Sequence, residues 1–449
     1  MTTACGSDEL IGRSAMRKAS WRLLPLIGLG YGIAYMDRVN ISFASLQMNE
    51  DLHFSATVYG LGGGLFFLSY ALLEVPSNLL LVRFGARRWI ARIMVTWGVL
   101  SAAMMFVKLP MQFYVMRFLL GAAEAGFFPG VLFYLMHWFP AAQRGRAVSR
   151  FYVALPLSSV FMGAVAGSLL KLHGQFGLAG WQWLFLLEGI PAILLSAVIL
   201  WGLPNSPAEA PWLNDAERSW IHNSLAADKA ALGAVADHNL IRALFDPRVL
   251  QLGICNLFIL GSAYALILSA PAVLQGATHW SATTVGFVVS GGGVLGALAM
   301  ILNGWHSDRR RERHVHTAIP LALMAVTCLA MGFVTAPWIV VSAYLVWVIS
   351  QNAVQGTFWL IPSDVLHGRS AAVGVAAIGS IGMVGSFIGP YAWGIAKDFT
   401  GSYHAGLLWL VVPHLAAAAI VLVARRTQRA IRRAPYTKET SVSLAPGVG

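Results

Sequence analysis

Long apolar runs alternate with short polar connections along the 449 residues of this chain. A helix needs about 20 mostly apolar residues to cross the hydrocarbon core of a bilayer. Twelve runs of about that length can be placed, near residues 21–44, 56–81, 89–107, 112–136, 147–170, 182–203, 249–275, 284–306, 316–335, 338–361, 371–395 and 404–424. The pattern predicts an all-α membrane protein with twelve transmembrane helices.

Composition and charge agree with a protein of the lipid bilayer. Hydrophobic residues make up 57% of the chain and charged residues only 11%, against about 25% charged in soluble proteins. The net charge of +12 could suggest a nucleic-acid partner, but the basic residues are concentrated in alternate connections. These are Arg13, Arg17 and Lys18 before the first run, Arg83, Arg87, Arg88 and Arg92 after the second, Arg144, Arg146 and Arg150 after the fourth, Arg309, Arg310, Arg311 and Arg313 after the eighth, Arg369 after the tenth, and Arg425, Arg426, Arg429, Arg432 and Arg433 after the last. By the positive-inside rule, both termini are expected in the cytoplasm, and no nucleic-acid partner is expected.

The longest polar stretch divides the chain into two halves. We expect an N-terminal six-helix bundle at 1–204, a cytoplasmic central loop at 205–248, a C-terminal six-helix bundle at 249–424 and a basic cytoplasmic tail at 425–449. A basic segment at 78–88 corresponds to one at 304–314, an offset of 226, and Arg146 corresponds to Arg369 at an offset of 223. Two nearly equal offsets predict duplicated halves related by a pseudo-two-fold axis, with a substrate site between them.

Two charges lie inside the apolar run at 112–138, namely Arg117 and Glu124. Seven residues correspond to about two helical turns, so both side chains are expected on one face. An ionisable group near the bilayer centre costs at least about 2.5–3.5 kcal/mol on insertion scales. Such groups therefore face a bundle interior or a wet cavity, and they usually mark a transport path.

The first apolar run also carries charges, Asp37 and Arg38, and Tyr31, Tyr35 and Arg38 share one helical face. Arginine suits a carboxylate because its guanidinium is a planar fork that stays charged. We expect Arg38 and Arg117 to hold a substrate carboxylate, with Tyr31 and Tyr35 beside them and Tyr35 as a hydrogen-bond donor. Two alternatives stay open: the arginines only neutralise Asp37 and Glu124, or the carboxylates occupy the arginines until they are protonated.

Proton coupling requires a carboxyl that can change its protonation state. Glu124 is flanked by GAA and AGFFPG, and such apolar surroundings favour the protonated form. Glu124 is therefore the first candidate for the proton carrier, and Asp37 is the second, as part of a coupled pair. Glu74, close to the end of the second run, is expected to pair with the basic loop that follows it as a gate element.

The second half offers neutral polar groups in its apolar runs. These are Asn256, Tyr264, Gln351, Asn352 and Gln355. They could contact hydroxyls or ring substituents of a substrate, or they could only hydrogen-bond neighbouring helices. No P-loop, HExxH or GxSxG signature is present, and the three cysteines are far apart. We therefore expect neither an enzyme nor an ATP-driven pump, and no metal or cofactor, with a proton gradient as the energy source.

The basic loops resemble the pattern G-x-x-x-D-R-x-G-R-R of the major facilitator superfamily. The second copy has Gly304, Asp308 and Arg309, whereas the first has Arg83, Gly85 and Arg87 but Asn78 and Val82 at the glycine and aspartate positions. The resemblance implies that these loop residues, together with Arg146 and Arg369 after the fourth and tenth runs, belong to the gates.

Four further segments resemble the anion:cation symporter family within that superfamily, which includes bacterial tartrate, phthalate, hydroxyphenylacetate and sugar-acid permeases. They are YMDRVNISFA, EVPSNLLLVRFGARRWIARIM, RFLLGAAEAGFFPG and WQWLFLLEGIPA. The resemblance implies proton-coupled uptake of a small organic carboxylate, such as tartrate or an aromatic acid, by a monomer in the bacterial inner membrane. A sugar-acid symporter and a non-transporting anion receptor are the alternatives. Gly379 and Met383 stand where the family pattern often has asparagines, which argues against a polyhydroxylated sugar acid.

Overall fold

The computed structural model describes residues 2–231, 245–365 and 369–433, and every regular element within these ranges is a helix. The α-helices are α1 (Thr2–Asp51), α2 (Ala56–Phe84), α3 (Ala86–Ala103), α4 (Pro110–Glu124), α5 (Phe127–Met136), α6 (Ala141–Tyr152), α7 (Ala154–Leu169), α8 (Gly180–Gly202), α9 (Asp215–Ala231), α11 (Pro247–Thr278), α12 (Ala282–Arg310), α13 (His314–Phe333), α14 (Pro337–Phe358), α15 (Leu360–Val365), α16 (Arg369–Thr400), α17 (Tyr403–Trp409) and α18 (Val411–Arg433). Parts of the expected central loop and tail, 232–244 and 434–449, lie outside the described residues.

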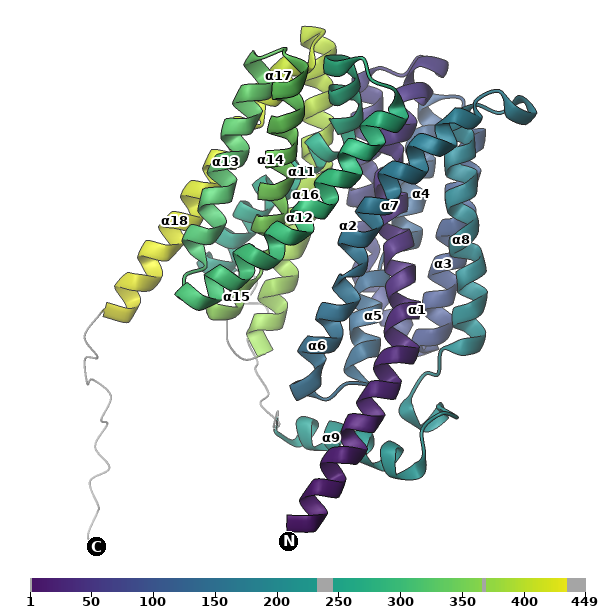
Figure 1. The fold of residues 1–449 in the computed structure, drawn as a ribbon, viewed down its shortest axis with the longest axis vertical. Coiled ribbons are helices and arrows are strands. Elements are labelled where there is room, and N and C mark those ends of the chain that lie inside the picture. Colours follow the sequence, from purple (N-terminus) through teal and green to yellow (C-terminus); the bar gives the residue numbers. More distant parts are fainter. Residues whose placement is uncertain (1, 232–244, 366–368, 434–449) are drawn as a thin grey trace, which may run out of the picture.

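The helices form two groups, α1–α8 and α11–α18, which stand side by side in Figure 1. Each group has its own hydrophobic core. The first contains Trp97, Phe113 and Trp138, and the second contains Met324 and Trp347. Each core is built almost entirely from one half of the sequence, and Leu268 of the second half is a buried member of the first core.

Eleven helical segments of the described chain are long and apolar enough to cross a membrane. Helix α1, which contains the first predicted span, is not among them because Asp37, Arg38 and Asn40 lower its hydropathy. It nevertheless packs within the first group of helices, against α7 and α8, and it also contacts α11. The all-α fold predicted from the apolar runs is confirmed, with α1 as a polar member of the bundle.

Several predicted spans are divided between two helices, and among them is the one at 112–136 that carries the charges. Helix α4 ends at Glu124 and α5 begins at Phe127, with Gly126 between them at φ 86°. Glycine adopts this left-handed conformation without steric cost, and a Cβ at Gly126 would also lie 2.4 Å from Oγ of Ser77. The membrane span predicted near 112–136 is found as one candidate segment, Pro110–Met136, but its helix is broken directly after the buried glutamate.

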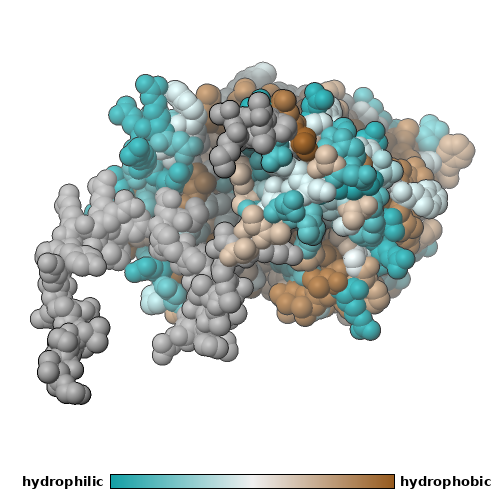
Figure 2. All heavy atoms as spheres, turned by 90° about the horizontal axis from the view of Figure 1, so that it is seen from below, coloured by the Kyte–Doolittle hydropathy of each residue, from teal (hydrophilic) through white to brown (hydrophobic). Residues whose placement is uncertain are grey.

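The two ends of the molecule differ in character. We call the end that carries the start of α1, the α2–α3 junction and the α12–α13 junction the basic end, and the opposite end the far end (Figure 1). Figure 2, seen from the basic end, shows hydrophilic residues over much of the visible face. Helix α9 lies across this end and is tied to α1, because Glu217 accepts hydrogen bonds from Ser14 and Lys18, each at 2.8 Å.

The two halves meet closely at the far end. Helix α7 crosses α12 where a Cβ on Gly163 would lie 2.1 Å from the carbonyl oxygen of Gly286. Thr283 donates a hydrogen bond to the carbonyl of Gly167 at 2.8 Å, and Tyr59 donates one to the carbonyl of Leu268 at 2.7 Å. These contacts close the far end between the halves.

Candidate substrate-binding and proton-coupling site

Four charged side chains are buried together within the first half. Asp37 and Arg38 come from α1, and Arg117 and Glu124 come from α4; Arg117 and Glu124 are both 0% exposed. Nε of Arg38 donates to Oε1 of Glu124 at 2.6 Å, and Nη2 of Arg38 forms an ion pair with the same oxygen. The structure therefore pairs Glu124 with Arg38 of another helix, and not with Arg117 of its own helix.

Close packing of α4 on α2 determines where the charges lie. A Cβ on Gly121 would be 2.1 Å from the carbonyl oxygen of Phe66, so the glycine allows the two backbones to approach. This approach places the ring of Phe66 near both guanidinium groups. The Cζ atoms of Arg38 and Arg117 lie 5.9 and 4.9 Å from its centroid. Such cation–π contacts stabilise a desolvated guanidinium and leave its edge available for an anion.

Arg117 has unused hydrogen-bonding capacity. Its Nε is 3.4 Å from the carbonyl oxygen of Gly62, and neither Nη1 nor Nη2 has a hydrogen-bond partner in the described part of the chain. Asp37 and Glu124 act on its charge electrostatically. A buried guanidinium with two free donor nitrogens is a suitable receptor for a planar carboxylate.

Asp37 is held by neutral groups and not by its neighbour Arg38. Its Oδ1 accepts hydrogen bonds from Ser101 of α3 and from Nδ2 of Asn40, the latter at 3.2 Å. Its Oδ2 has no partner among the described residues. The carboxyl is therefore fixed in place but retains one oxygen that can take a proton.

Aromatic residues of both halves surround Arg38. Its Cζ is 4.9 Å from the ring centroid of Tyr70, and its charge acts on the hydroxyls of Tyr70 and Tyr264. Tyr264 comes from α11 of the second half and packs on Phe67, with 4.2 Å between ring centroids. The second half thus reaches the charged site through Tyr264.

The two predicted tyrosines of α1 have different surroundings. Tyr31 is buried against Phe151, with 4.8 Å between ring centroids, and against Phe128 at 5.4 Å. Tyr35 is partly buried, and Arg38 acts on it electrostatically. Tyr35 is therefore the better placed of the two to contact a molecule held by Arg38.

The predicted amides of the second half lie on α11 and α14. Asn256 donates to the carbonyl of Ile378 at 3.0 Å, a contact between helices, and Asn352 donates to Val348 of its own helix at 2.9 Å. Gln351 is buried, and its Oε1 has no partner in the described ranges, whereas Gln355 is partly buried. Gln351 is thus the amide with a free acceptor.

The predicted gating residues of the first half lie at the basic end of α2 and α3. Arg83 is exposed and lies over the ring of Phe84, and Gly85 joins the two helices at φ 84°. The backbone N–H of Arg87 donates to Oδ1 of Asn205 at 3.2 Å. Glu74 is partly buried, and Arg38 is the charge that acts on it.

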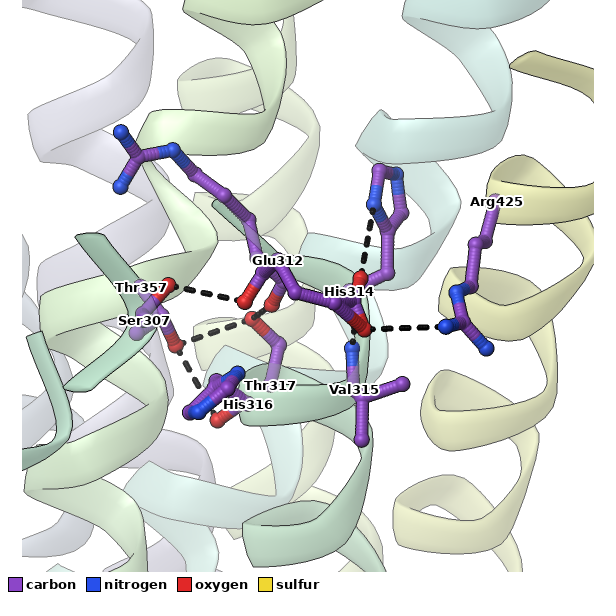
Figure 3. Close-up of polar contacts among 9 residues, drawn as sticks. Ser307, Glu312, His314, Val315, His316, Thr317, Thr357 and Arg425 are labelled. Carbon is purple, nitrogen blue, oxygen red and sulfur yellow. Dashed lines mark hydrogen bonds and ion pairs between the residues drawn. The ribbon is translucent and has the colours of Figure 1, made fainter. Parts of the chain in front are cut away.

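The corresponding junction of the second half contains a polar network, shown in Figure 3. Glu312 pairs with Arg425 of α18 at 3.2 Å and accepts through its carbonyl from Ser307, while Thr317 donates to Thr357 of α14 at 2.9 Å. The network ties α12, α13, α14 and α18 together at the basic end.

The remaining predicted gating residues lie around this network and on α6. Asp308 pairs with Arg313 at 2.6 Å, and Arg309 lies over the ring of Trp305. Arg146 is an exposed residue of α6. Arg369 is the first residue of α16, and its side chain lies outside the described part of the structure.

Several residues of the site were not predicted from the sequence. Phe66 and Tyr70 of α2 lie in a uniformly apolar run, where nothing distinguishes them from residues that face lipid. Ser101 is a small residue without a local motif. Asn40 follows Asp37 by three positions, which is the spacing of a side-chain contact on a helix, and this signal could have identified it.

Comparisons with known proteins agree with the geometry. The family model described as Major Facilitator Superfamily matches residues 27–390. A protein from Agrobacterium vitis described as a tartrate transporter is 42% identical over 92% of this chain and 91% of its own length. A protein from Pseudomonas putida described as the metabolite transport protein NicT is 41% identical over 94% of this chain and 97% of its own.

Solved structures share the fold. A bacterial homologue of the human lysosomal transporter Spinster has a TM-score of 0.78 at 17% identity, covering 93% of this chain and 99% of its own. A D-xylose-proton symporter has a TM-score of 0.70 at 17% identity, covering 89% and 97%. The apolar helices, the two groups of helices and these matches lead to one conclusion: the chain is a membrane transporter that belongs to the Major Facilitator Superfamily.

Proposed function

We propose that this transporter takes up a small organic carboxylate together with protons by alternating access. The observation that carries the proposal is the buried fork of Arg117, whose Nη1 and Nη2 have no partner in the described chain although the side chain is 0% exposed. Leaving charged donors unpaired in a buried site is costly, so a ligand that pairs with them gains that free energy on binding. The relatives described as tartrate transporters support a hydroxy acid as the ligand.

Arg38 is the second carboxylate-binding group, and Glu124 occupies it in the present conformation. Protonation of Glu124 neutralises that partner and frees the guanidinium edge for a substrate oxygen. Asp37 is the second proton carrier, beside Arg117. The proton and the anion thus depend on each other, because the anion replaces a carboxylate that the proton has neutralised.

The halves are in contact at the far end, and we infer that the present conformation is closed on that side. The positive-inside rule assigns the basic end to the cytoplasm of a bacterial cell and the far end, where the halves touch, to the outside of its inner membrane. The charged residues come from the first half and Tyr264 from the second half of one chain, so a monomer contains the complete site. The proton gradient supplies the energy, and the cycle needs no cofactor.

The experiment is uptake into liposomes that contain the purified transporter, with radiolabelled tartrate and an imposed pH gradient, acidic outside. Wild-type protein should accumulate the anion above its external concentration. Glu124→Gln should lose this accumulation but retain counterflow exchange, because glutamine mimics the protonated carboxyl. Undiminished uphill uptake by Glu124→Gln would refute its role as proton carrier.

Binding is tested separately by thermal shift, because a ligand that binds only the folded protein raises its melting temperature. Tartrate, an aromatic carboxylate such as benzoate, and gluconate represent three substrate classes. The preferred acid should stabilise wild-type protein but not Arg117→Gln. Equal stabilisation of the two proteins would contradict the assignment of Arg117.

A further inference from the structure

Phe66 of α2 lies beside both arginines of the anion site. The side chain is fully buried, and its ring centroid is 4.9 Å from Cζ of Arg117 and 5.9 Å from Cζ of Arg38. Within the described residues, no other ring makes a cation–π contact with both guanidinium groups. A guanidinium gains most from such a contact where it has lost its water, as in this buried site.

The two arginines depend on this ring to different degrees. Arg38 also has an ion-pair partner, Glu124, and a second ring, that of Tyr70 at 4.9 Å. Among the described residues, the guanidinium of Arg117 has only Phe66 and a long hydrogen bond, 3.4 Å from its Nε to a backbone carbonyl of α2. The orientation of the Arg117 fork therefore rests mainly on Phe66.

A carboxylate of the protein competes for this fork. Glu124 lies seven residues from Arg117 along α4, on the same helical face, and its Oε2 is buried without a hydrogen-bond partner in the described chain. If the guanidinium of Arg117 turned toward this oxygen, a substrate would have to displace Glu124 before it could bind. Attraction to the face of the Phe66 ring opposes that rotation, because it fixes the position of the cation.

The ring of Phe66 is itself held firmly. The ring of Phe67 packs edge-on against it, with 5.1 Å between centroids and an angle of 83° between the planes. A Cβ on Gly121 would lie 2.1 Å from the carbonyl oxygen of Phe66, so α4 packs directly on its backbone. Phe67 in turn contacts Tyr264 of the second half, with 4.2 Å between ring centroids. Phe66 is therefore a fixed support for the arginines.

We propose that Phe66 is a positioning residue for anion binding. Its ring holds the guanidinium of Arg117 in the orientation that presents Nη1 and Nη2 to a substrate carboxylate. Phe66 acts through the arginine and needs no contact with the substrate. Such preorganisation raises affinity, because the site does not have to rearrange when the ligand arrives. The inference rests on the proposed function, in which Arg117 binds the anion.

The test replaces Phe66 by phenylalanines that carry one, two or three fluorine atoms on the ring. Fluorine withdraws electron density from the ring face and weakens its attraction for a cation stepwise, while the shape of the side chain is almost unchanged. Initial uptake of radiolabelled tartrate into liposomes gives KM and the maximal rate. The KM should rise with each fluorine, by about tenfold for three. The maximal rate should change by less than about twofold, because the effect is on binding.

The matched control is the same fluorine series at Phe185 of α8. This side chain is also fully buried and packs on the ring of Trp181, with 6.3 Å between centroids, but it makes no cation–π contact in the described part of the chain. Its KM should stay constant. Melting temperatures without substrate test the contact independently of transport, and they should fall further along the Phe66 series than along the Phe185 series.

A KM that stays constant or falls along the Phe66 series would overturn the proposal. A falling melting temperature with a constant KM would show that the ring only stabilises the fold. Tartrate uptake by wild-type protein is measured in the same liposomes. Its absence would refute the proposed function, whereas a constant KM along the Phe66 series beside normal wild-type uptake would refute the role of Phe66 alone.

Discussion

Arg38 of α1 and Glu124 of α4 form a buried ion pair in which Nε of Arg38 lies 2.6 Å from Oε1 of Glu124. Removing one partner of a buried pair usually costs about 3–5 kcal/mol, because the other charge is left uncompensated. In a transporter, protonation of Glu124 or the arrival of an anion changes which group Arg38 pairs with. Because Arg38 donates to Glu124 from its Nε, the planar shape of its side chain is as important as its charge.

Arg38→Lys should raise the KM for the substrate by about tenfold or more, although the positive charge is retained. Lysine lacks the planar fork, and the loss of one charged hydrogen bond corresponds to about 1.5–3 kcal/mol, where 1.4 kcal/mol is a factor of ten. Initial uptake rates in liposomes measure the effect. The matched control is Arg92→Lys. Arg92, like Arg38, contacts an aromatic ring, here that of Trp89 on α3, but it does not belong to the anion site. Equal KM values for Arg38→Lys and wild type would contradict the prediction.

Asp398→Asn should weaken closure of the far end. The carboxylate oxygens of Asp398, on α16, accept hydrogen bonds from the N–H groups of Ala56 and Thr57 at 2.9 and 2.7 Å, so a residue of the second half caps α2 of the first. A charge at a helix N-terminus contributes up to about 2 kcal/mol. The ratio of far-end-closed to far-end-open molecules should therefore fall by up to about thirtyfold, measured from spin-label distances across the far end.

A suitable control for this cap is Asp246→Asn. Asp246 caps α11 within its own half, accepting from the N–H of Arg248 at 2.7 Å. The substitution Asp246→Asn should leave the spin-label distances across the far end unchanged. If both substitutions shifted the distances equally, the effect would come from helix capping in general and not from a link between the halves.

Gly286→Ala should also oppose closure, for a steric reason. The new Cβ would lie 2.1 Å from the carbonyl oxygen of Gly163, so the crossing of α7 and α12 must widen. Overpacking of this kind typically costs about 1–3 kcal/mol. Spin-label distances across the far end measure the shift. Gly291→Ala on the same helix is the control, because its Cβ would meet nothing within 4 Å. Closure of Gly286→Ala to the wild-type distance would contradict the prediction.

The sequence predicts helices and buried charges well because both follow from the cost of polar groups in lipid. Arg117 and Glu124 are identified from their spacing alone, and the structure buries both. The partner of Glu124 is not predictable in this way, since Arg38 is 86 positions away and reaches it only in the folded bundle. The helix break at Gly126 is hidden within an apolar run.

The structure also changes the interpretation of predicted polar groups. Asn256 was open to two interpretations, and its hydrogen bond to Ile378 shows a contact between helices. Glu74, which was expected to pair with the basic loop, is partly buried on α2, where the charge of Arg38 acts on it. Both outcomes depend on rotation of a helix about its axis, which apolar runs without periodicity leave undetermined.

Glu217 should make the stability of the basic end depend on pH. Burial alone would raise the pKa of its carboxyl, but hydrogen bonds from Lys18, the backbone N–H of Asn214 and Ser14 outweigh burial and lower the pKa below its ordinary value. A group with a lowered pKa in the folded state stabilises the protein above its unfolded pKa, about 4.3 for glutamate, and this contribution is lost as pH falls through the folded value.

Glu217→Gln should therefore lower the melting temperature by a few degrees at pH 7, because the charged hydrogen bonds to Lys18 and Ser14 are weakened and α9 is held less firmly on α1. The difference from wild type should shrink as the pH falls below about 4, where the wild-type carboxyl is also neutral. The control is Asp215→Asn, an exposed partner of Arg218 on the same helix, and such surface pairs contribute little. A difference between Glu217→Gln and wild type that is independent of pH would show that the side chain acts through packing and not through its charge.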